Sequence, residues 1–230
     1  MDGANQRFMT QKAAWLTDHM ILYAVAKGTT SGNPYSQDLG TVNAELDTYE
    51  FDLRKVGKII NGGGTGKMYE LQGIGEGIGT GRNFKARTTS GSTHPIKAYF
   101  LPWGTGMTFC GKLGNKADYF FTPTVNGCTF AYNGAAANPS VAHSNFVNNQ
   151  IIDQNAIDND LVAKFGAAPA RTLIKATYKQ APVPNVADDY RATVIGIRTA
   201  NGWSFYYQNY SVLLQTGKLV YSGINLCVPI

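Results

Sequence analysis

Cys128 and His143 are the residues of this chain whose types best fit covalent chemistry, and they lie fifteen positions apart. A cysteine nucleophile needs a base that takes its proton and later delivers a proton to the leaving group. Histidine does both because its pKa lies near neutrality. Such a site also needs a group that holds the imidazole in one tautomer, and backbone N–H groups that face the developing oxyanion.

The segment Thr122–Cys128, with the sequence TPTVNGC, supplies further parts of such a site. Gly127 adopts backbone conformations that other residues avoid, so we expect a turn at Asn126 and Gly127 that exposes Cys128 at the start of a strand. In that turn the N–H of Cys128 and a neighbouring loop amide would face the oxyanion. Thr122 ends the preceding strand, and its hydroxyl or carbonyl oxygen would orient His143. Spacing alone fits equally a buried, inert Cys128.

The other chemical groups form weaker patterns. We predict that His19 lies on a helix surface and that His94 lies in a loop before Pro95. Cysteines and histidines show no zinc-binding spacing, so we expect no metal and no cofactor. The glycine-rich segments 61–67 and 73–81 lack the full phosphate-binding and dinucleotide-binding motifs, and we expect strand-connecting loops there.

Composition narrows the class of protein. Charged residues make up only 15% of the 230 residues, which together with 26 glycines favours strands and tight turns. The net charge is +5, but the basic residues are scattered and form no stripe, so we expect no nucleic-acid partner. An odd count of 3 cysteines argues against a disulfide scaffold. No apolar run is long enough to span a membrane, and we expect no cleaved secretory signal.

Two segments have apolar residues at helical spacing, residues 5–26 and residues 144–165. The rest of the chain has short strand patterns separated by glycine-rich turns. We therefore predict one α+β domain over residues 1–230, with a mixed or antiparallel sheet and helices packed against one side. The expected strands are 49–53, 68–71, 84–87, 96–101, 117–121 and 128–132, a hairpin of 192–198 and 203–210, and a closing strand at 219–228.

The residues around Cys128 resemble those of a known family. The segment FFTPTVNGC ending at Cys128, followed by His143, is similar to the Leu-x-Gly-Cys signature of the cytotoxic necrotizing factor catalytic domain and of Burkholderia lethal factor. The chemoreceptor glutamine deamidases resemble it more distantly. In lethal-factor-like proteins a threonine stands six positions before the cysteine inside a Phe-Phe-Thr run, as Thr122 does here. Val125 replaces the leucine of the signature, and Asn126 replaces its usual serine.

The resemblance extends beyond the signature on both sides. Upstream, YFLPW at 99–103 is similar to the Leu-Pro-Trp strand end of the lethal factor, and downstream GIRT at 196–199 and SFYYQ at 204–208 are similar to its C-terminal hairpin. It covers residues 99–143 well and residues 194–210 loosely. The gap from the cysteine to the histidine is longer than in the lethal factor and closer to that of the necrotizing factors.

This resemblance implies a sandwich with a mixed sheet and flanking helices, and a protein-glutamine deamidase of the toxin or effector kind. Cys128, His143 and Thr122 would be the catalytic set, with Gly127 and Asn126 at the oxyanion turn. The implied partner is a host protein with a critical glutamine, of the GTPase or helicase type. The expected location is the target-cell cytosol after export without a classical signal peptide, or otherwise the cytoplasm. A transglutaminase or peptidase, and a non-catalytic binding protein that keeps the fold, are the alternatives.

Overall fold

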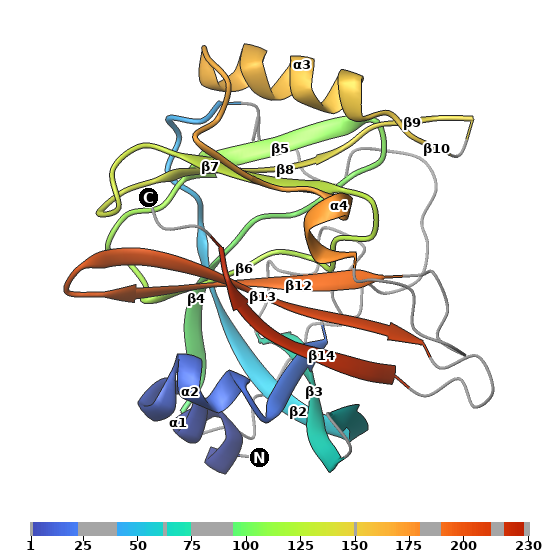
Figure 1. Cartoon of the computed structure of the whole chain (residues 1–230). Coiled ribbons are helices and arrows are strands. Elements are labelled where there is room, and N and C mark those ends of the chain that lie inside the picture. Colours follow the sequence, from blue (N-terminus) through green and yellow to red (C-terminus); the bar gives the residue numbers. More distant parts are fainter. Residues whose placement is uncertain are drawn as a thin grey trace.

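The computed structural model describes residues 2–22, 41–61, 64–74, 94–149, 151–179, 190–212 and 219–227, and β-strands are the main secondary structure of these residues (Figure 1). Its largest element is an eight-stranded mixed sheet with the order β1-β3-β2-β14-β13-β12-β6-β4. These strands are β1 His19–Leu22, β2 Thr48–Asn61, β3 Gly64–Ile74, β4 Ile96–Phe100, β6 Tyr119–Phe121, β12 Arg191–Thr199, β13 Gly202–Val212 and β14 Leu219–Leu226.

The eight-stranded sheet curls until it is nearly closed. Strand β2 pairs with β14 on one side and with β4 at the far end of the strand order, so the strands from β2 to β4 form a ring. The predicted hairpin of β12 and β13 is confirmed, with Thr199 opposite Gly202. The predicted closing strand is also confirmed, since β14 joins β13 to β2.

A second sheet lies over one face of the first, as Figure 1 shows. It has the order β11-β7-β8-β5, with β5 Met107–Lys112, β7 Thr129–Asn133, β8 Ser140–Asn145 and β11 Arg171–Leu173. Buried side chains from both sheets form one core between them, among them Phe120, Phe130, Tyr132 and Phe205. Aromatic rings meet across this core at centroid distances of 4.7–5.8 Å, within the range of favourable ring pairs.

In the part of the chain that the structure describes, four helices flank the sheets. Helices α1 Asp2–Gln11 and α2 Ala13–Leu16 pack against the large sheet through Phe8, Trp15 and Leu16. Helix α3 Gln154–Phe165 covers the outer face of the small sheet through Ile157 and Leu161. The short α4 Lys175–Tyr178 precedes the segment that leads to β12. The prediction of a mixed sheet with flanking helices is confirmed at this level of description. The α+β balance and the sandwich arrangement are not confirmed, because the described chain is mostly strand and the large sheet bends toward closure.

The two predicted helices were too long. The first ends at Leu16, and His19–Leu22 forms β1, which pairs in parallel with β3, so the expected helix position of His19 was wrong. Tertiary contacts explain why this segment is a strand and not a helix. The side chain of Gln208 accepts a hydrogen bond from the Ile21 N–H and donates to the carbonyls of Leu16 and His19.

The second helix begins only at Gln154, because Asp153 caps it by accepting a hydrogen bond from the Ala156 N–H at 3.0 Å. The preceding residues form the end of β8 and the small hairpin of β9 Val147–Asn148 and β10 Ile151–Ile152. The glycine-rich segments also differ from expectation. Residues 64–67 and 73–74 belong to β3, whereas residues 75–81 and the expected strand 84–87 lie outside the described residues.

Within the described ranges, no helix is both long and apolar enough to cross a membrane.

Candidate functional site

The loop between β6 and β7 carries Cys128 at its end, directly before β7 begins at Thr129. Val125 fixes this loop to the large sheet. Its N–H donates to the Ala192 carbonyl at 2.8 Å and its carbonyl accepts from the Ala192 N–H at 3.0 Å. The loop therefore connects the two sheets and holds the cysteine between them.

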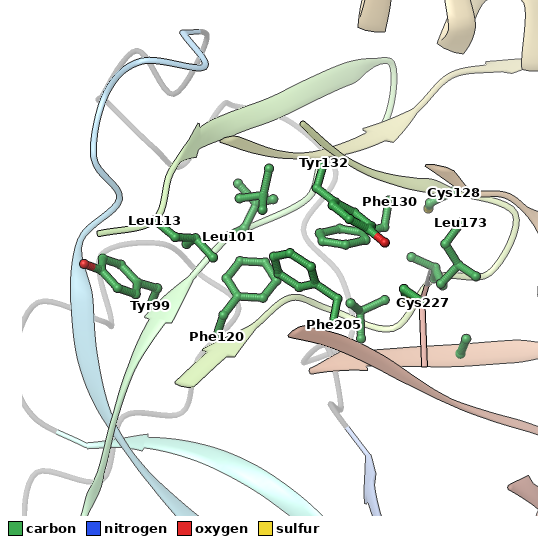
Figure 2. Close-up of a cluster of buried hydrophobic side chains, with 14 of the residues drawn as sticks. Tyr99, Leu101, Leu113, Phe120, Cys128, Phe130, Tyr132, Leu173, Phe205 and Cys227 are labelled. Atoms are coloured by element: carbon green, nitrogen blue, oxygen red, sulfur yellow. The ribbon is translucent and has the colours of Figure 1, made fainter. Parts of the chain in front are cut away.

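Gly127 makes the predicted turn, with a φ of +90°. A Cβ atom at this position would lie 2.6 Å from two side-chain atoms of Ile152, so even alanine would collide there. The Gly127 N–H donates to the hydroxyl oxygen of Tyr178 at 2.6 Å, so this amide is engaged within the fold. The turn does not expose the cysteine as expected, because Cys128 is only 5% exposed and belongs to the core between the sheets (Figure 2).

His143 lies in the middle of the small sheet. It is directly opposite Phe130 on β7 and Phe109 on β5, and none of its surface is exposed. Side chains on a strand alternate between faces, so Cys128, two positions before Phe130, shares the face that carries His143. Such diagonal positions on neighbouring strands are roughly 7–8 Å apart through space, within reach of an aromatic side chain such as that of histidine.

Thr122 holds the imidazole of His143. The Thr122 Oγ1 lies 2.7 Å from His143 Nδ1, and it donates to the Leu101 carbonyl at 2.8 Å. A threonine hydroxyl has one hydrogen and a carbonyl oxygen can only accept, so Thr122 donates its hydrogen to the Leu101 carbonyl. His143 Nδ1 must then carry the ring proton and donate it to Thr122. The other ring nitrogen, Nε2, is left as a bare acceptor, and no described residue forms a hydrogen bond with it.

The large sheet positions Thr122 and Leu101 together. Strands β4 and β6 run parallel with Phe100 opposite Phe121, and the Leu101 N–H donates to the Phe121 carbonyl at 3.1 Å. Residues that follow neighbouring parallel strands emerge at the same edge of the sheet. Thr122 and Leu101 therefore leave the large sheet side by side, and His143 reaches them from the small sheet.

Burial determines the charge of the Cys128 thiol and of the His143 imidazole. It raises the pKa of the Cys128 thiol to about 11, although the backbone N–H groups of Asn126 and Cys128 face the sulfur and partly oppose this rise. Burial lowers the pKa of His143 to about 3. At neutral pH the structure therefore holds a neutral thiol and a neutral imidazole. The low-pKa thiolate expected of a reactive cysteine is absent in this closed arrangement.

The structure brings the predicted residues together, except that Cys128 and His143 do not form a hydrogen bond with each other. Thr122 contacts His143 as expected, Gly127 forms the turn, and Asn126 lies exposed beside it with its N–H toward the sulfur. The Cys128 thiol forms no hydrogen bond with His143 Nε2. The other two cysteines, Cys110 and Cys227, are also buried, and neither forms a disulfide.

Two contributors to this site were missed by sequence reasoning. The Leu101 carbonyl fixes the tautomer of His143 through Thr122, and the Tyr178 hydroxyl fixes the turn at Gly127. The parallel strand ends at Leu101 and Thr122 offered a signal for the first. Tyr178 lies in a four-residue helix far along the chain from Gly127, and the sequence carries no sign of their contact.

No model of a known protein family matches the sequence, and no curated protein matches it. Among solved structures, the chain is similar to the C-terminal domain of CNFy from Yersinia pseudotuberculosis, with a TM-score of 0.32 and 12% sequence identity. The similarity covers 81% of this chain and 89% of that one. A TM-score of this size does not establish a common fold.

Proposed function

We propose that this protein is a protein-glutamine deamidase in which Cys128 is the nucleophile, His143 the general base and acid, and Thr122 the residue that orients His143. The observation that carries the proposal is the state of His143. Its Nδ1–H is committed to Thr122, and its Nε2 lone pair is free on the sheet face that also carries Cys128. A general base for a thiol needs this tautomer.

In the first step, His143 Nε2 takes the thiol proton while the Cys128 sulfur attacks the carboxamide carbon of a glutamine side chain. The carbonyl oxygen becomes an oxyanion. The backbone N–H groups of Asn126 and Cys128 face the sulfur, and we assign the oxyanion to them. The Gly127 N–H is not assigned, since it already donates to Tyr178.

In the second step, His143 returns the proton to the leaving nitrogen, ammonia departs, and a thioester joins Cys128 to the former glutamine. Water then attacks the thioester carbon while His143 takes one of its protons. The thioester breaks, the sulfur recovers a proton from His143, and the product is glutamate. Thr122 keeps Nδ1 protonated throughout, so that Nε2 alone exchanges the proton.

Before substrate binds, the Cys128 thiol and the His143 imidazole are both neutral. This state fits the cycle if the bound substrate brings the thiol and the imidazole into contact. Both are buried here, so binding of the glutamine side chain has to open the face between Cys128 and His143. The partner in this proposal is a host protein with a critical glutamine, and the protein acts in the cytosol of a target cell as a toxin or effector. The sequence resemblance supports the choice of glutamine.

The test is to incubate the purified protein, and separately its Cys128→Ser variant, with a cell lysate and to search all peptides by mass spectrometry. The proposal predicts glutamate at glutamine positions with the native protein and none with the variant. New crosslinks between glutamine and lysine would instead identify a transglutaminase, and new chain ends a peptidase.

A non-catalytic binding protein is favoured by one observation, the burial and raised pKa of Cys128. A purely structural cysteine would have these properties. That alternative predicts that the lysate shows none of the three modifications, and that Cys128→Ser changes only stability.

A further inference from the structure

Asn145 is a polar residue on the face of the small sheet that packs toward the large sheet. It lies two positions after His143 on β8, and side chains two positions apart on a strand share a face. The other face of β8 carries Ala142, which packs with Ile157 and Leu161 of α3. Neither the family resemblance nor the proposed catalytic set includes Asn145.

The register of the small sheet places Asn145 across from Cys128. Strands β7 and β8 are antiparallel, with Thr129 opposite Ser144. One position further along each strand, Cys128 comes opposite Asn145. Directly opposite residues have Cβ atoms roughly 4.5–5.5 Å apart, closer than diagonal neighbours such as Cys128 and His143. Asn145 is therefore a nearer neighbour of the cysteine than the proposed general base is.

The backbone of Asn145 is fixed from its other side as well. Asn145 lies opposite Met107 on β5, and its carbonyl accepts a hydrogen bond from the Gly106 N–H at 2.6 Å. Strand β8 ends at this residue, but these contacts hold the end in the sheet. The Asn145 side chain consequently has a fixed origin beside the cysteine.

The carboxamide of Asn145 is buried without a partner in the fold. The residue is 7% exposed, and no described residue forms a hydrogen bond with its side chain. Buried polar side chains are normally hydrogen-bonded, because a group without a partner loses its contacts with water for nothing in return. A substrate group that donates to or accepts from this carboxamide would account for an asparagine at this position.

The end of the sheet face at Cys128 and Asn145 is also the end closer to solvent. His143 and Phe130 have no exposed surface, whereas Cys128 is 5% exposed and Asn145 is 7% exposed. Met107, opposite Asn145, is only partly buried. A side chain that approaches from this end meets Asn145 and the sulfur before it meets the imidazole.

We propose that Asn145 binds the carboxamide oxygen of the substrate glutamine and is a third donor to the oxyanion that forms on it. The Asn145 Nδ2–H donates to this oxygen, together with the backbone N–H groups of Asn126 and Cys128. A donor fixed beside the developing charge binds the transition state more strongly than the substrate, and so speeds the reaction. This inference rests on the proposed deamidase function and adds a residue that recognises the reacting group.

The variant Asn145→Leu tests this role, because leucine has nearly the shape of asparagine but no hydrogen-bonding group. Native protein, Asn145→Leu and Asn133→Leu are incubated separately with a cell lysate, and mass spectrometry follows the rate of glutamate formation at each glutamine. Asn133 is the matched control, since it is also an asparagine of the small sheet but lies at the far end of β7, opposite Ser140.

We expect Asn145→Leu to lower the rate by roughly 10²–10³-fold, the range for removing one side-chain oxyanion donor, and Asn133→Leu to leave it unchanged. The urea midpoint of Asn145→Leu should stay the same or rise, because the carboxamide has no partner in the fold. An unchanged rate in Asn145→Leu overturns the proposal. A lowered midpoint also overturns it, because it would show that the side chain is held by the fold itself.

A binding measurement separates this inference from the deamidase itself. N-acetylglutamine amide and N-acetylnorleucine amide are titrated into isotope-labelled Cys128→Ala protein, and the NMR signals of the Asn145 side-chain amide are followed. Shifts with the glutamine probe alone, without deamidation of the lysate by native protein, would refute the deamidase and keep Asn145 as a carboxamide-binding residue. Deamidation that Asn145→Leu leaves unchanged would keep the deamidase and refute the role of Asn145, and the absence of both shifts and deamidation would refute both.

Discussion

The substitution Thr122→Val tests the arrangement around His143. Valine keeps the shape of the side chain but removes its hydroxyl, and with it the hydrogen bonds to Leu101 and His143. Leaving one partner of a buried hydrogen bond unsatisfied costs roughly 1–3 kcal/mol, so the two groups left without a partner predict a loss of about 2–6 kcal/mol in the free energy of unfolding.

A change of tautomer does not recover this loss. If the ring proton moves from Nδ1 to Nε2, the buried unpaired N–H of His143 is merely relocated, because no described residue accepts from Nε2. The move also removes the lone pair that takes the thiol proton. We therefore expect deamidation to fall by roughly 10²–10⁴-fold, the range typical of losing a general base.

Thr193 provides the matched control. It is also a buried threonine of the large sheet, at 1% exposure, but its hydroxyl has no hydrogen-bond partner among the described residues. Thr193→Val should therefore leave the free energy of unfolding unchanged or raise it by up to about 1 kcal/mol. Thr122→Ser retains the hydroxyl and should keep most of the activity.

Urea unfolding followed by circular dichroism measures the stability of these variants, and ammonia release measures their activity. Equal stability changes for Thr122→Val and Thr193→Val would refute the hydrogen-bond assignment. Full activity in Thr122→Val would refute the role of Thr122 in orienting His143, whatever its stability.

Three further predictions concern neighbouring groups. Burial lowers the pKa of His143 from its ordinary 6.5 to about 3. At pH values between these two, the imidazole is protonated in the unfolded chain but not in the folded protein. Stability should therefore fall as pH drops through that window, by up to about 1.4 kcal/mol per pH unit, and urea unfolding of His143→Phe should show a flatter dependence. Gly127→Ala should lose more stability in urea unfolding than Gly106→Ala, by about 1–3 kcal/mol, because both positions have positive φ but only Gly127 faces Ile152. Equal losses would contradict this packing. Tyr178→Phe should leave the Gly127 N–H without its acceptor, cost roughly 1–3 kcal/mol and speed hydrogen exchange at that amide, whereas unchanged exchange would contradict the hydrogen bond.

The parts of this fold that were predictable from sequence are those with strong local patterns. The β12–β13 hairpin follows from two strand-like runs around Thr199–Gly202, and α3 follows from the spacing of Ile157 and Leu161. Strand β1 was missed because Gln208, far along the chain, provides the hydrogen bonds that hold it. Local propensity carries no information on such a contact.

The candidate site was predictable to a similar degree. The contact of Thr122 with His143 followed from a threonine at a strand end and a single suitable histidine. The burial of the pair was not predictable, because it arises from Phe109 and Phe130 on neighbouring strands and from the sheet packed above them. The pKa shifts of Cys128 and His143 follow from that packing and not from their spacing.

The most direct test of the deamidase proposal is to carry out the reaction in water labelled with heavy oxygen and to compare native protein with Cys128→Ser and Thr122→Val. A thioester that water resolves places one heavy oxygen atom in each new glutamate side chain. We predict this label at glutamine positions of a partner protein with the native protein, none with Cys128→Ser, and a trace with Thr122→Val. Absence of labelled glutamate with the native protein, or equal labelling with Cys128→Ser, would contradict the account.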